Sequence, residues 1–247
     1  YLSIKIKVMK KAIIAGVGAL NGLGSELSHK FAQENLDVTV VGRTEEKILK
    51  VCESIKNIGL SANPYVCDVT NENEVKKLFD LFNSDLDLVV YNAGNNMHGK
   101  IIDMDPSYFE ECWRICCYGA FLFSKYSLLN FAQNKTPGKL FFTGASASLR
   151  GRSNYGAFNS AKGAMRNLAQ ALAKEYAQDN IHVAHVIVDG PLDGEKIRIK
   201  FPDFIEKFGQ ERLISIKGVA DGYLFLYHQK KSAWSFEIDL RTYKEDW

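Results

Sequence analysis

Short apolar runs alternate with amphipathic stretches from residue 11 almost to the end of the chain. Several of the apolar runs are rich in valine and isoleucine, which suit parallel strands buried on both faces. Between the runs, apolar positions recur at intervals of three and four residues, the period of an amphipathic helix. The expected strands, together with the residues that directly follow some of them, cover residues 11–15, 37–42, 62–69, 86–94, 139–143, 181–192 and 235–241.

The expected helices are long enough to carry the chain back from the end of one strand to the start of the next. They cover residues 25–31, 45–57, 70–82, 106–134, 155–176 and 218–229. Strands and helices that alternate in this way predict a parallel sheet with helices on both faces. The expected fold is therefore a three-layer, doubly wound α/β (Rossmann-type) single domain, with ligand at the carboxyl ends of the strands. We expect it to span residues 10–247, after an N-terminal extension at residues 1–9.

Composition and charge mainly exclude function classes. Of 247 residues, 46% are apolar and 24% are charged, as in ordinary globular proteins. The net charge of +2, with scattered basic residues, gives no case for a nucleic-acid or membrane partner. The longest apolar runs fall far short of the ~20 residues that span a bilayer. The five cysteines lack metal-ligand spacing, which indicates reduced thiols in a cytoplasmic protein and no metal site.

A glycine-rich turn joins the first strand to the first helix. Its spacing is Gly18-x-x-x-Gly22-x-Gly24, with Asn21 and Leu23 flanking the middle glycine. We expect Gly18 to permit the tight turn, Gly22 to let the backbone approach a pyrophosphate, and Gly24 to let the helix pack closely on the strand. The free N–H groups at the helix start would then hold phosphate. The strand–turn–helix context predicts that this segment binds a dinucleotide.

The helix expected at 155–176 carries the candidate catalytic residues. Tyr155, Phe158 and Lys162 lie near one stripe of this helix. A lysine beside a phenol lowers the pKa of the tyrosine for proton transfer. The stretch resembles the Tyr-x-x-x-Lys active-site helix of short-chain dehydrogenases/reductases, and the glycine spacing is similar to that of the same family. The departure is that the tyrosine position holds Phe158.

The resemblance implies where the adenosine part of a cofactor lies. In the family, the strand-end pair that matches Asp68 and Val69 frames the adenine, although Asp68 is also suited to cap the helix expected at 70–82. Arg43 and Thr44 stand where NAD-preferring relatives carry a carboxylate, so we expect NADP(H) to be preferred over NAD(H). The alternative is that Arg43 is a solvated residue at a helix start.

Two further segments match the family near the ribose and the nicotinamide. The residues after the fourth strand match the family's Asn-Ala-Gly. The exit of the sixth strand resembles its Pro-Gly segment, with Asp189 in place of the proline. In the family, the lysine also holds the ribose. The resemblance therefore assigns cofactor contacts to Asn92, Ala93, Gly94, Lys162, Pro191 and Leu192.

The catalytic set departs from the family at more positions than Phe158, whose lack of a titratable group costs roughly 10²–10⁴ in rate. Cys116 stands where an asparagine helps to hold a relay water, and a thiol cannot fully replace it. Counting back to the family's serine reaches Ala145, and only a one-residue irregularity would bring in Ser146. Tyr155 is the best substitute proton donor if the helix begins late. The alternative is that its ring packs near the helix start.

Patterns in the C-terminal third predict a segment that covers the substrate and a surface that contacts a partner subunit. Residues 193–217, rich in charge and bulky apolar side chains, are expected to cover the substrate. His182 and His185 should lie on opposite faces of their strand in structural roles. The aromatic tail predicts packing against a partner subunit, in a homodimer or homotetramer. Its aromatic residues are Trp234, Phe236, Tyr243 and Trp247.

Two interpretations of the function follow from these patterns. The first is an oxidoreductase that uses NADP(H), with NAD(H) as second choice, on a small-molecule carbonyl or alcohol through a rearranged proton donor. The alternative is a dinucleotide-binding protein with little or no turnover, acting as a sensor or a structural subunit. The glycine turn and Lys162 support cofactor binding in both, so these residues do not separate the two.

Overall fold

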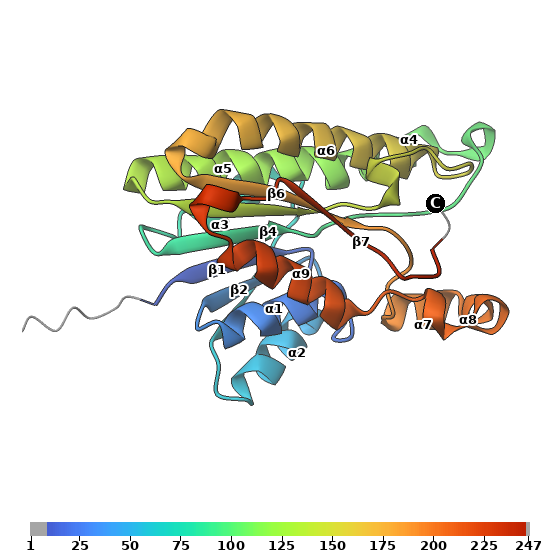
Figure 1. The fold of residues 1–247 in the computed structure, drawn as a ribbon, viewed down its shortest axis with the longest axis horizontal. Coiled ribbons are helices and arrows are strands. Elements are labelled where there is room, and N and C mark those ends of the chain that lie inside the picture. The colour runs from blue at the N-terminus through green and yellow to red at the C-terminus, as the bar shows by residue number, and fades with distance from the viewer. Residues whose placement is uncertain (1–8, 246–247) are drawn as a thin grey trace, which may run out of the picture.

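The computed structural model describes residues 9–245 and shows one sheet of seven strands between two layers of helices (Figure 1). The strand order is β3-β2-β1-β4-β5-β6-β7, and neighbouring strands are parallel. β1 pairs with both β2 and β4, so the order reverses at the point where doubly wound sheets bind ligands. The predicted fold class is confirmed. Residues 1–8 of the expected extension, and Trp247, lie outside the described residues.

The elements match the expected alternation, apart from small differences at most of their ends. The strands are β1 Lys11–Ala15, β2 Asp37–Gly42, β3 Ala62–Val66, β4 Leu86–Tyr91, β5 Gly138–Thr143, β6 Ile181–Val188 and β7 Glu237–Leu240. The α-helices are α1 Leu23–Gln33, α2 Glu45–Lys56, α3 Glu72–Phe79, α4 Pro106–Trp113, α5 Gly119–Asn134, α6 Gly156–Tyr176, α7 Glu195–Lys200, α8 Pro202–Phe208 and α9 Ile216–His228.

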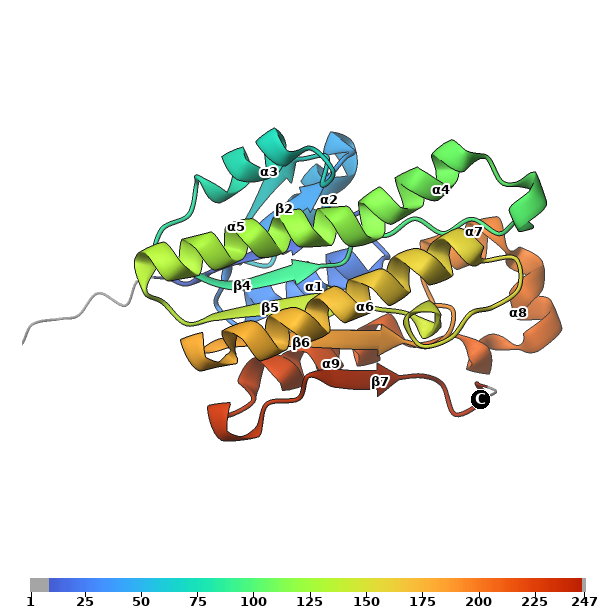
Figure 2. The ribbon, with the colours of Figure 1, turned by 90° about the horizontal axis from the view of Figure 1, so that it is seen from above.

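Each face of the sheet has its own hydrophobic core. Ala12 and Ile14 of β1 pack with residues of α1, α2 and α9 on one face. Ile13 and Ala15 pack on the other face with residues of α3, α5 and α6, and Figure 2 shows α5 and α6 in front of the sheet. Because both faces are buried, the central strands carry continuous apolar runs.

The helix predicted at 106–134 is interrupted by a π-helical segment at Arg114–Tyr118. The fully buried Tyr91, at the end of β4, donates its hydroxyl hydrogen bond to the carbonyl of Ile115. Gly119 leaves the space for this phenol, because a Cβ there would overlap the Tyr91 hydroxyl. A side chain inserted into a helical hydrogen-bond ladder is a known cause of such an interruption.

The helix predicted at 70–82 begins later, and Asp68 does not cap it. The N-cap of α3 is Asn71, whose side chain accepts hydrogen bonds from two backbone N–H groups of the first turn, at 3.1 and 3.4 Å. Asp68 instead accepts from the backbone N–H and the hydroxyl of Thr70, at 2.9 and 2.8 Å. Its carboxylate therefore orders the turn between β3 and α3.

The segment expected to cover the substrate contains two short helices, α7 and α8, between β6 and α9. It is tied down at both ends. Leu192 and Ile214 form an isolated parallel bridge. The backbone N–H of Glu195 donates to the carbonyl of Asn21 at 3.1 Å, so the segment begins directly against the glycine-rich turn.

Candidate active site

The glycine-rich turn brings α1 against the end of β4. Asn92 donates from its side-chain amide to the carbonyl of Gly16 at 3.1 Å. A Cβ on Gly24 would lie 3.0 Å from that carbonyl oxygen, which confirms the close packing expected of this glycine. The tight turn was assigned to Gly18, and this was wrong: the left-handed residue is Gly16, with φ +85°, and a Cβ on Gly18 would meet nothing within 4 Å.

The start of α1 is open to a phosphate. Gly22 is its N-cap, with extended backbone and no side-chain hydrogen bond to the first turn. The first N–H groups of a helix have no partner within the helix and attract anions. Since Gly22 has no side chain, the backbone there is free to approach a ligand. The residues of this turn therefore fit the diphosphate of a dinucleotide.

Beyond the end of β2 lies a pocket of about 340 Å³. Arg43 and Asp68, both singled out from the sequence, line it. Arg114 was not anticipated: it donates to the carbonyl of Thr70 at 3.4 Å, and its guanidinium lies 4.9 Å from the centre of the Tyr118 ring. The other lining residues are Thr70, Ser107, Glu110, Glu111 and Ile115. Two arginines thus share this pocket with three carboxylates.

Lys162 lies at the centre of the site. Its ammonium donates to the carbonyl of Thr143, at the end of β5, at 2.7 Å, and only 4% of the residue is exposed. A Cβ on Gly94, just past β4, would lie 3.6 Å from the Lys162 nitrogen. Burial lowers the pKa of Lys162, and the sulfurs of Cys116 and Cys112 partly oppose this. The ammonium is thus held between the ends of β4 and β5.

Phe158 presents an apolar ring to this lysine. The ring centre is 5.8 Å from the Lys162 nitrogen. The ring packs, half-buried, against an apolar cluster of Tyr108, Cys112, Cys116, Ala157 and Ala161. Phe158 therefore adds apolar surface beside the ammonium and supplies no proton.

Tyr155 is the residue just before α6, and the helix does begin late. Its backbone is outside the helical region (φ −125°, ψ 28°), and the preceding Asn154 is left-handed (φ 66°). The half-buried Tyr155 ring packs edge-on against His98, with ring centres 5.1 Å apart. The carbonyl of Asn154 accepts from the N–H of Gly99 at 2.8 Å. Tyr155 is thus attached to the loop that follows β4.

The loop after β5 contains both candidate serines. Ser146 is half-buried and opens a short 3₁₀ turn that ends at Ser148. The buried Ser148 hydroxyl accepts from the backbone N–H of Ala145 at 3.2 Å, so it stabilises the turn. Among residues 9–245, the Ser146 hydroxyl makes no such hydrogen bond.

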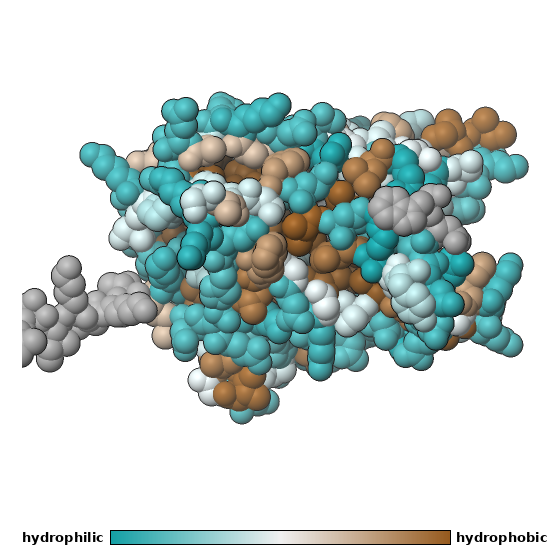
Figure 3. Space-filling model, in the orientation of Figure 1, coloured by the Kyte–Doolittle hydropathy of each residue, from teal (hydrophilic) through white to brown (hydrophobic). Residues whose placement is uncertain are grey.

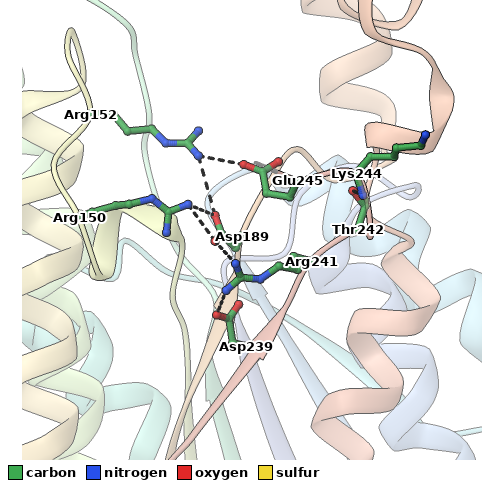
Figure 4. Close-up of polar contacts among 8 residues, drawn as sticks. All are labelled: Arg150, Arg152, Asp189, Asp239, Arg241, Thr242, Lys244 and Glu245. Atoms are coloured by element: carbon green, nitrogen blue, oxygen red, sulfur yellow. Dashed lines mark hydrogen bonds and ion pairs between the residues drawn. The ribbon is translucent and has the colours of Figure 1, made fainter. Parts of the chain in front are cut away.

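Asp189, at the exit of β6, is surrounded by arginines (Figure 4). The carboxylate is completely buried, and each of its oxygens accepts from Arg150 at 3.0 Å. Arg241 and Arg152 approach it to 3.5 and 4.0 Å. Arg152 also pairs with Glu245 at 2.9 Å, and Arg241 pairs with Asp239. These pairs join the loop after β5 to the residues that follow β7.

Sequence reasoning identified Asp189 as unusual but missed its partners. The only local signal was a charged residue in place of the family's proline. The arginines come from segments far away in the chain, and nothing in their own neighbourhoods marks them. The network thus became visible only when the loops were brought together.

The two histidines of β6 have structural partners on opposite faces, as expected. His182 contacts the carbonyl of Ser235 at 2.9 Å and stacks on Trp234, with ring centres 4.7 Å apart. The fully buried His185 contacts the carboxylate of Glu237 at 2.9 Å. Burial lowers the pKa of His185 to about 4, against the opposing effect of Glu237. The ring is therefore neutral at pH 7 and donates to Glu237 from Nδ1.

Within residues 9–245, no helix is long and apolar enough to cross a membrane. In the same range, no three histidine, cysteine, aspartate or glutamate side chains are placed to hold a metal ion together.

Comparisons of this chain with known sequences and structures agree on one protein family. The sequence profile of short chain dehydrogenases matches residues 10–193. The chain is 26% identical over 206 residues to the uncharacterized oxidoreductase YxbG of Bacillus subtilis, covering 81% of this chain and 74% of that protein. It is 26% identical over 186 residues to a 2-dehydro-3-deoxy-D-gluconate 5-dehydrogenase of Formosa agariphila, covering 74% and 70%. A crystal structure of a short-chain dehydrogenase from Rhodopseudomonas palustris superposes with a TM-score of 0.80 at 31% identity, covering 95% of this chain and 99% of that one.

Proposed function

This chain belongs to the short chain dehydrogenase family, and from that premise we propose that it is a dinucleotide-dependent oxidoreductase of a small-molecule carbonyl or alcohol. The observation that carries the proposal is the arrangement at the β1–β4 switch point. The uncapped start of α1 at Gly22 offers N–H groups, and Lys162 offers its ammonium beside Gly94. A nicotinamide cofactor would supply or accept the hydride there.

The proposed cofactor contacts run along the carboxyl ends of the strands. The turn after β1 would hold the diphosphate, the ends of β2 and β3 the adenosine, and the end of β4 with Lys162 the second ribose. The full set is Gly18, Asn21, Gly22, Leu23, Gly24, Arg43, Thr44, Asp68, Val69, Asn92, Ala93, Gly94, Lys162, Pro191 and Leu192.

We propose that NADP(H) is preferred, with NAD(H) as the second choice. The exposed Arg43 lines the pocket beyond β2, where a 2′-phosphate would lie, and Arg114 lines the same pocket. An arginine pairs with a phosphate through two parallel hydrogen bonds. The carboxylates of Glu110 and Glu111 would repel the phosphate. The preference therefore requires that the attraction of Arg43 and Arg114 for the phosphate exceed this repulsion.

The proposed chemistry lacks the family's usual proton donor, because Phe158 occupies the tyrosine position. Lys162 binds the ribose, and Ser146 positions the substrate oxygen. Tyr155 is the proposed donor, since α6 begins only at Gly156 and the left-handed Asn154 bends the chain before it. Its hydroxyl would give the proton to the carbonyl oxygen in reduction and remove it in oxidation.

One observation favours the alternative of a cofactor binder with little turnover. The apolar ring of Phe158 lies beside the Lys162 ammonium, and the Tyr155 ring rests against His98. If Tyr155 stays in that position, the site binds a cofactor without a placed proton donor. The protein would then act as a sensor or a structural subunit.

We also propose a homodimer or homotetramer, formed by one domain at 10–247 in which residues 193–217 cover the substrate. Figure 3 shows apolar surface in the middle of the face that carries α9 and β7. Phe225 of α9 is 58% exposed, and β7 is an edge strand. All five cysteines are free and buried, which suits a reducing compartment such as the cytoplasm.

Thermal unfolding with each cofactor tests the proposal. A ligand that binds only the folded state raises the melting temperature, and at equal concentration the tighter ligand raises it more. We expect NADPH to raise it more than NADH at equal concentration, and Arg43→Ala to reduce the difference. Equal shifts would reject the role of Arg43, and no shift with either cofactor would reject the cofactor site.

A further inference from the structure

The segment that follows β7, residues 241–245, returns to the substrate side of the candidate site. It forms no helix or strand. Lys244 lies 3.8 Å from the carboxylate of Glu211, in the segment expected to cover the substrate. Glu245 pairs with Arg152, in the loop after β5, at 2.9 Å. Residues 241–245 therefore contact both the expected cover and the loop that carries Ser146.

The Glu245 carboxylate is held close to the exit of β6. Only 10% of its side chain is exposed. A Cβ on Gly190 would lie 3.3 Å from one of its oxygens, so the carboxylate rests against a residue that has no side chain. Pro191 and Leu192, which we assign to the cofactor, follow Gly190 directly. A nearly buried negative charge therefore lies next to the proposed cofactor contacts.

Arg152 is the arginine of this cluster that is least committed to Asp189. Arg150 and Arg241 approach the Asp189 carboxylate to 3.0 and 3.5 Å, whereas Arg152 stays at 4.0 Å. The Arg152 guanidinium instead donates a hydrogen bond to Glu245, as Figure 4 shows. Its side chain is 45% exposed. Arg152 can therefore exchange Glu245 for another anion while Asp189 keeps its closer partners.

The backbone of Arg152 is fixed to the start of α6. Its carbonyl accepts from the N–H of Tyr155 at 3.3 Å and from the side-chain amide of Asn159 at 2.9 Å. Tyr155 is the proton donor that we propose. A ligand that pairs with the Arg152 guanidinium is therefore held near this donor, on the substrate side of the sheet edge.

We propose that Arg152 binds a carboxylate of the substrate, and that Glu245 occupies this anion subsite until the substrate displaces it. This inference rests on the proposed function and narrows the substrate to an oxo acid or the hydroxy acid that is its reduced form. Exchange of one carboxylate for another keeps the guanidinium paired. A neutral carbonyl compound that displaced Glu245 would leave Arg152 without a carboxylate. The subsite therefore selects acids over neutral analogues.

Calorimetry tests this selection on the full chain saturated with NADP⁺, where an oxo acid binds without being reduced. The probes are pyruvate, acetoacetate and levulinate, which place the carboxylate at increasing distance from the ketone, each compared with its methyl ester. We expect an acid to bind at least about tenfold more tightly than its ester, because only the acid forms a charged hydrogen bond with arginine. Binding of NADP⁺ without any preference for an acid would overturn this inference alone. No binding of NADP⁺ or NAD⁺ would overturn the proposed function with it.

Variants then test the displacement of Glu245. Glu245→Gln removes the competing charge, so it should tighten acid binding about tenfold and leave ester binding unchanged. Arg152→Gln should abolish the preference for the acid, and Arg152→Lys should retain part of it. Glu237→Gln is the matched control, because it alters an arginine–glutamate pair with Arg166, between α6 and β7, and should leave the preference unchanged. Weaker acid binding in Glu245→Gln would overturn the inference, since Glu245 would then support the site instead of competing for it.

Discussion

On the β1–β4 side of the sheet, the candidate site is built from backbone groups and glycines. The Asn92 side chain donates to the carbonyl of Gly16, and Gly24 allows α1 to approach it. On the β5–β6 side, it is built from charged side chains paired across the molecule. Lys162 donates to Thr143, and the Asp189 carboxylate faces arginines from two other segments.

The difference separates contacts that a local spacing specifies from contacts between distant segments. Backbone contacts require glycine, or one amide, at a fixed spacing, so they leave a local pattern in the sequence. Charged pairs work with many residue combinations, as long as each buried charge has a partner. The contacts on the β5–β6 side therefore depend on where distant segments end. Five predictions test this contrast.

The largest expected effect is on the cofactor side. Gly16→Ala places a side chain at φ +85° and overlaps the backbone of Asn92 and Ala93. Strain and overpacking together should destabilise the fold by about 4 kcal/mol. The melting temperature should fall by roughly 8–16 °C. Gly18→Ala is the control for stability, because a Cβ there meets nothing within 4 Å. Similar losses in both variants would contradict the assignment of the tight turn to Gly16.

The second effect is on the substrate side. Asp189→Ala removes a fully buried carboxylate and leaves Arg150 and Arg241 without that partner. The loss should be about 3 kcal/mol, at the low end for a buried pair, because Arg150 is 33% exposed and can turn to water. Denaturant unfolding measures it. Asp193→Ala is the matched control, since it breaks an exposed pair with Arg198 and should cost under about 1 kcal/mol. Equal losses would show that the Asp189 network adds nothing.

The third effect concerns turnover. Phe158→Tyr places a phenol beside Lys162, so any carbonyl-reducing rate should rise about a hundredfold, near the low end for general acid catalysis. Phe158→Leu is the control and should leave the rate unchanged. An unchanged rate with tyrosine would mean that Cys116 or Ala145 limits the reaction instead.

The same assay identifies the present proton donor. Tyr155→Phe should abolish the remaining rate, while Ser146→Ala should only weaken it. The reverse order would assign the proton to the serine side of the site.

The smallest effect is a pH dependence from β6. The pKa of His185 is lowered to about 4 in the fold, below its usual value, so the unfolded chain binds its proton more readily. Its contribution to stability is therefore complete above pH 6.5 and is lost as the pH falls from 6.5 toward 4. The loss between pH 7 and pH 5 should be about 2 kcal/mol. The pKa of the paired Glu237 is also lowered in the fold, so its contribution to the free energy of unfolding is likewise lost as the pH falls, but at lower pH.

Unfolding at the two pH values measures this loss. A His185→Leu variant should show a loss about 2 kcal/mol smaller than the unmodified protein. His182 titrates in the same direction and is present in both proteins, so it cancels. Equal losses in the two proteins would exclude His185 as the cause.

The fold and the close approach of α1 at Gly24 could be predicted from the sequence because their causes are local. Buried parallel strands need apolar runs, and a helix that approaches a strand closely needs a glycine such as Gly24. The errors were also physical. The helix at 106–134 was expected to be regular because nothing within it shows that Tyr91, in another element, takes the carbonyl of Ile115. The cap of α3 was misplaced because Asp68 had a nearer partner in Thr70.

By itself, then, the sequence determined that strands alternate with helices along the chain. It also determined the glycine turn, the position of Lys162 and the presence of Phe158 four residues before it. Only the tertiary structure decided what surrounds them. Asp189 forms ion pairs with Arg150 and Arg241, and the Cys116 sulfur lies near Lys162, because separate loops end at one edge of the sheet. Periodicity and spacing report how each segment meets the core. Pairing between side chains depends on where distant segments end, which no local pattern records.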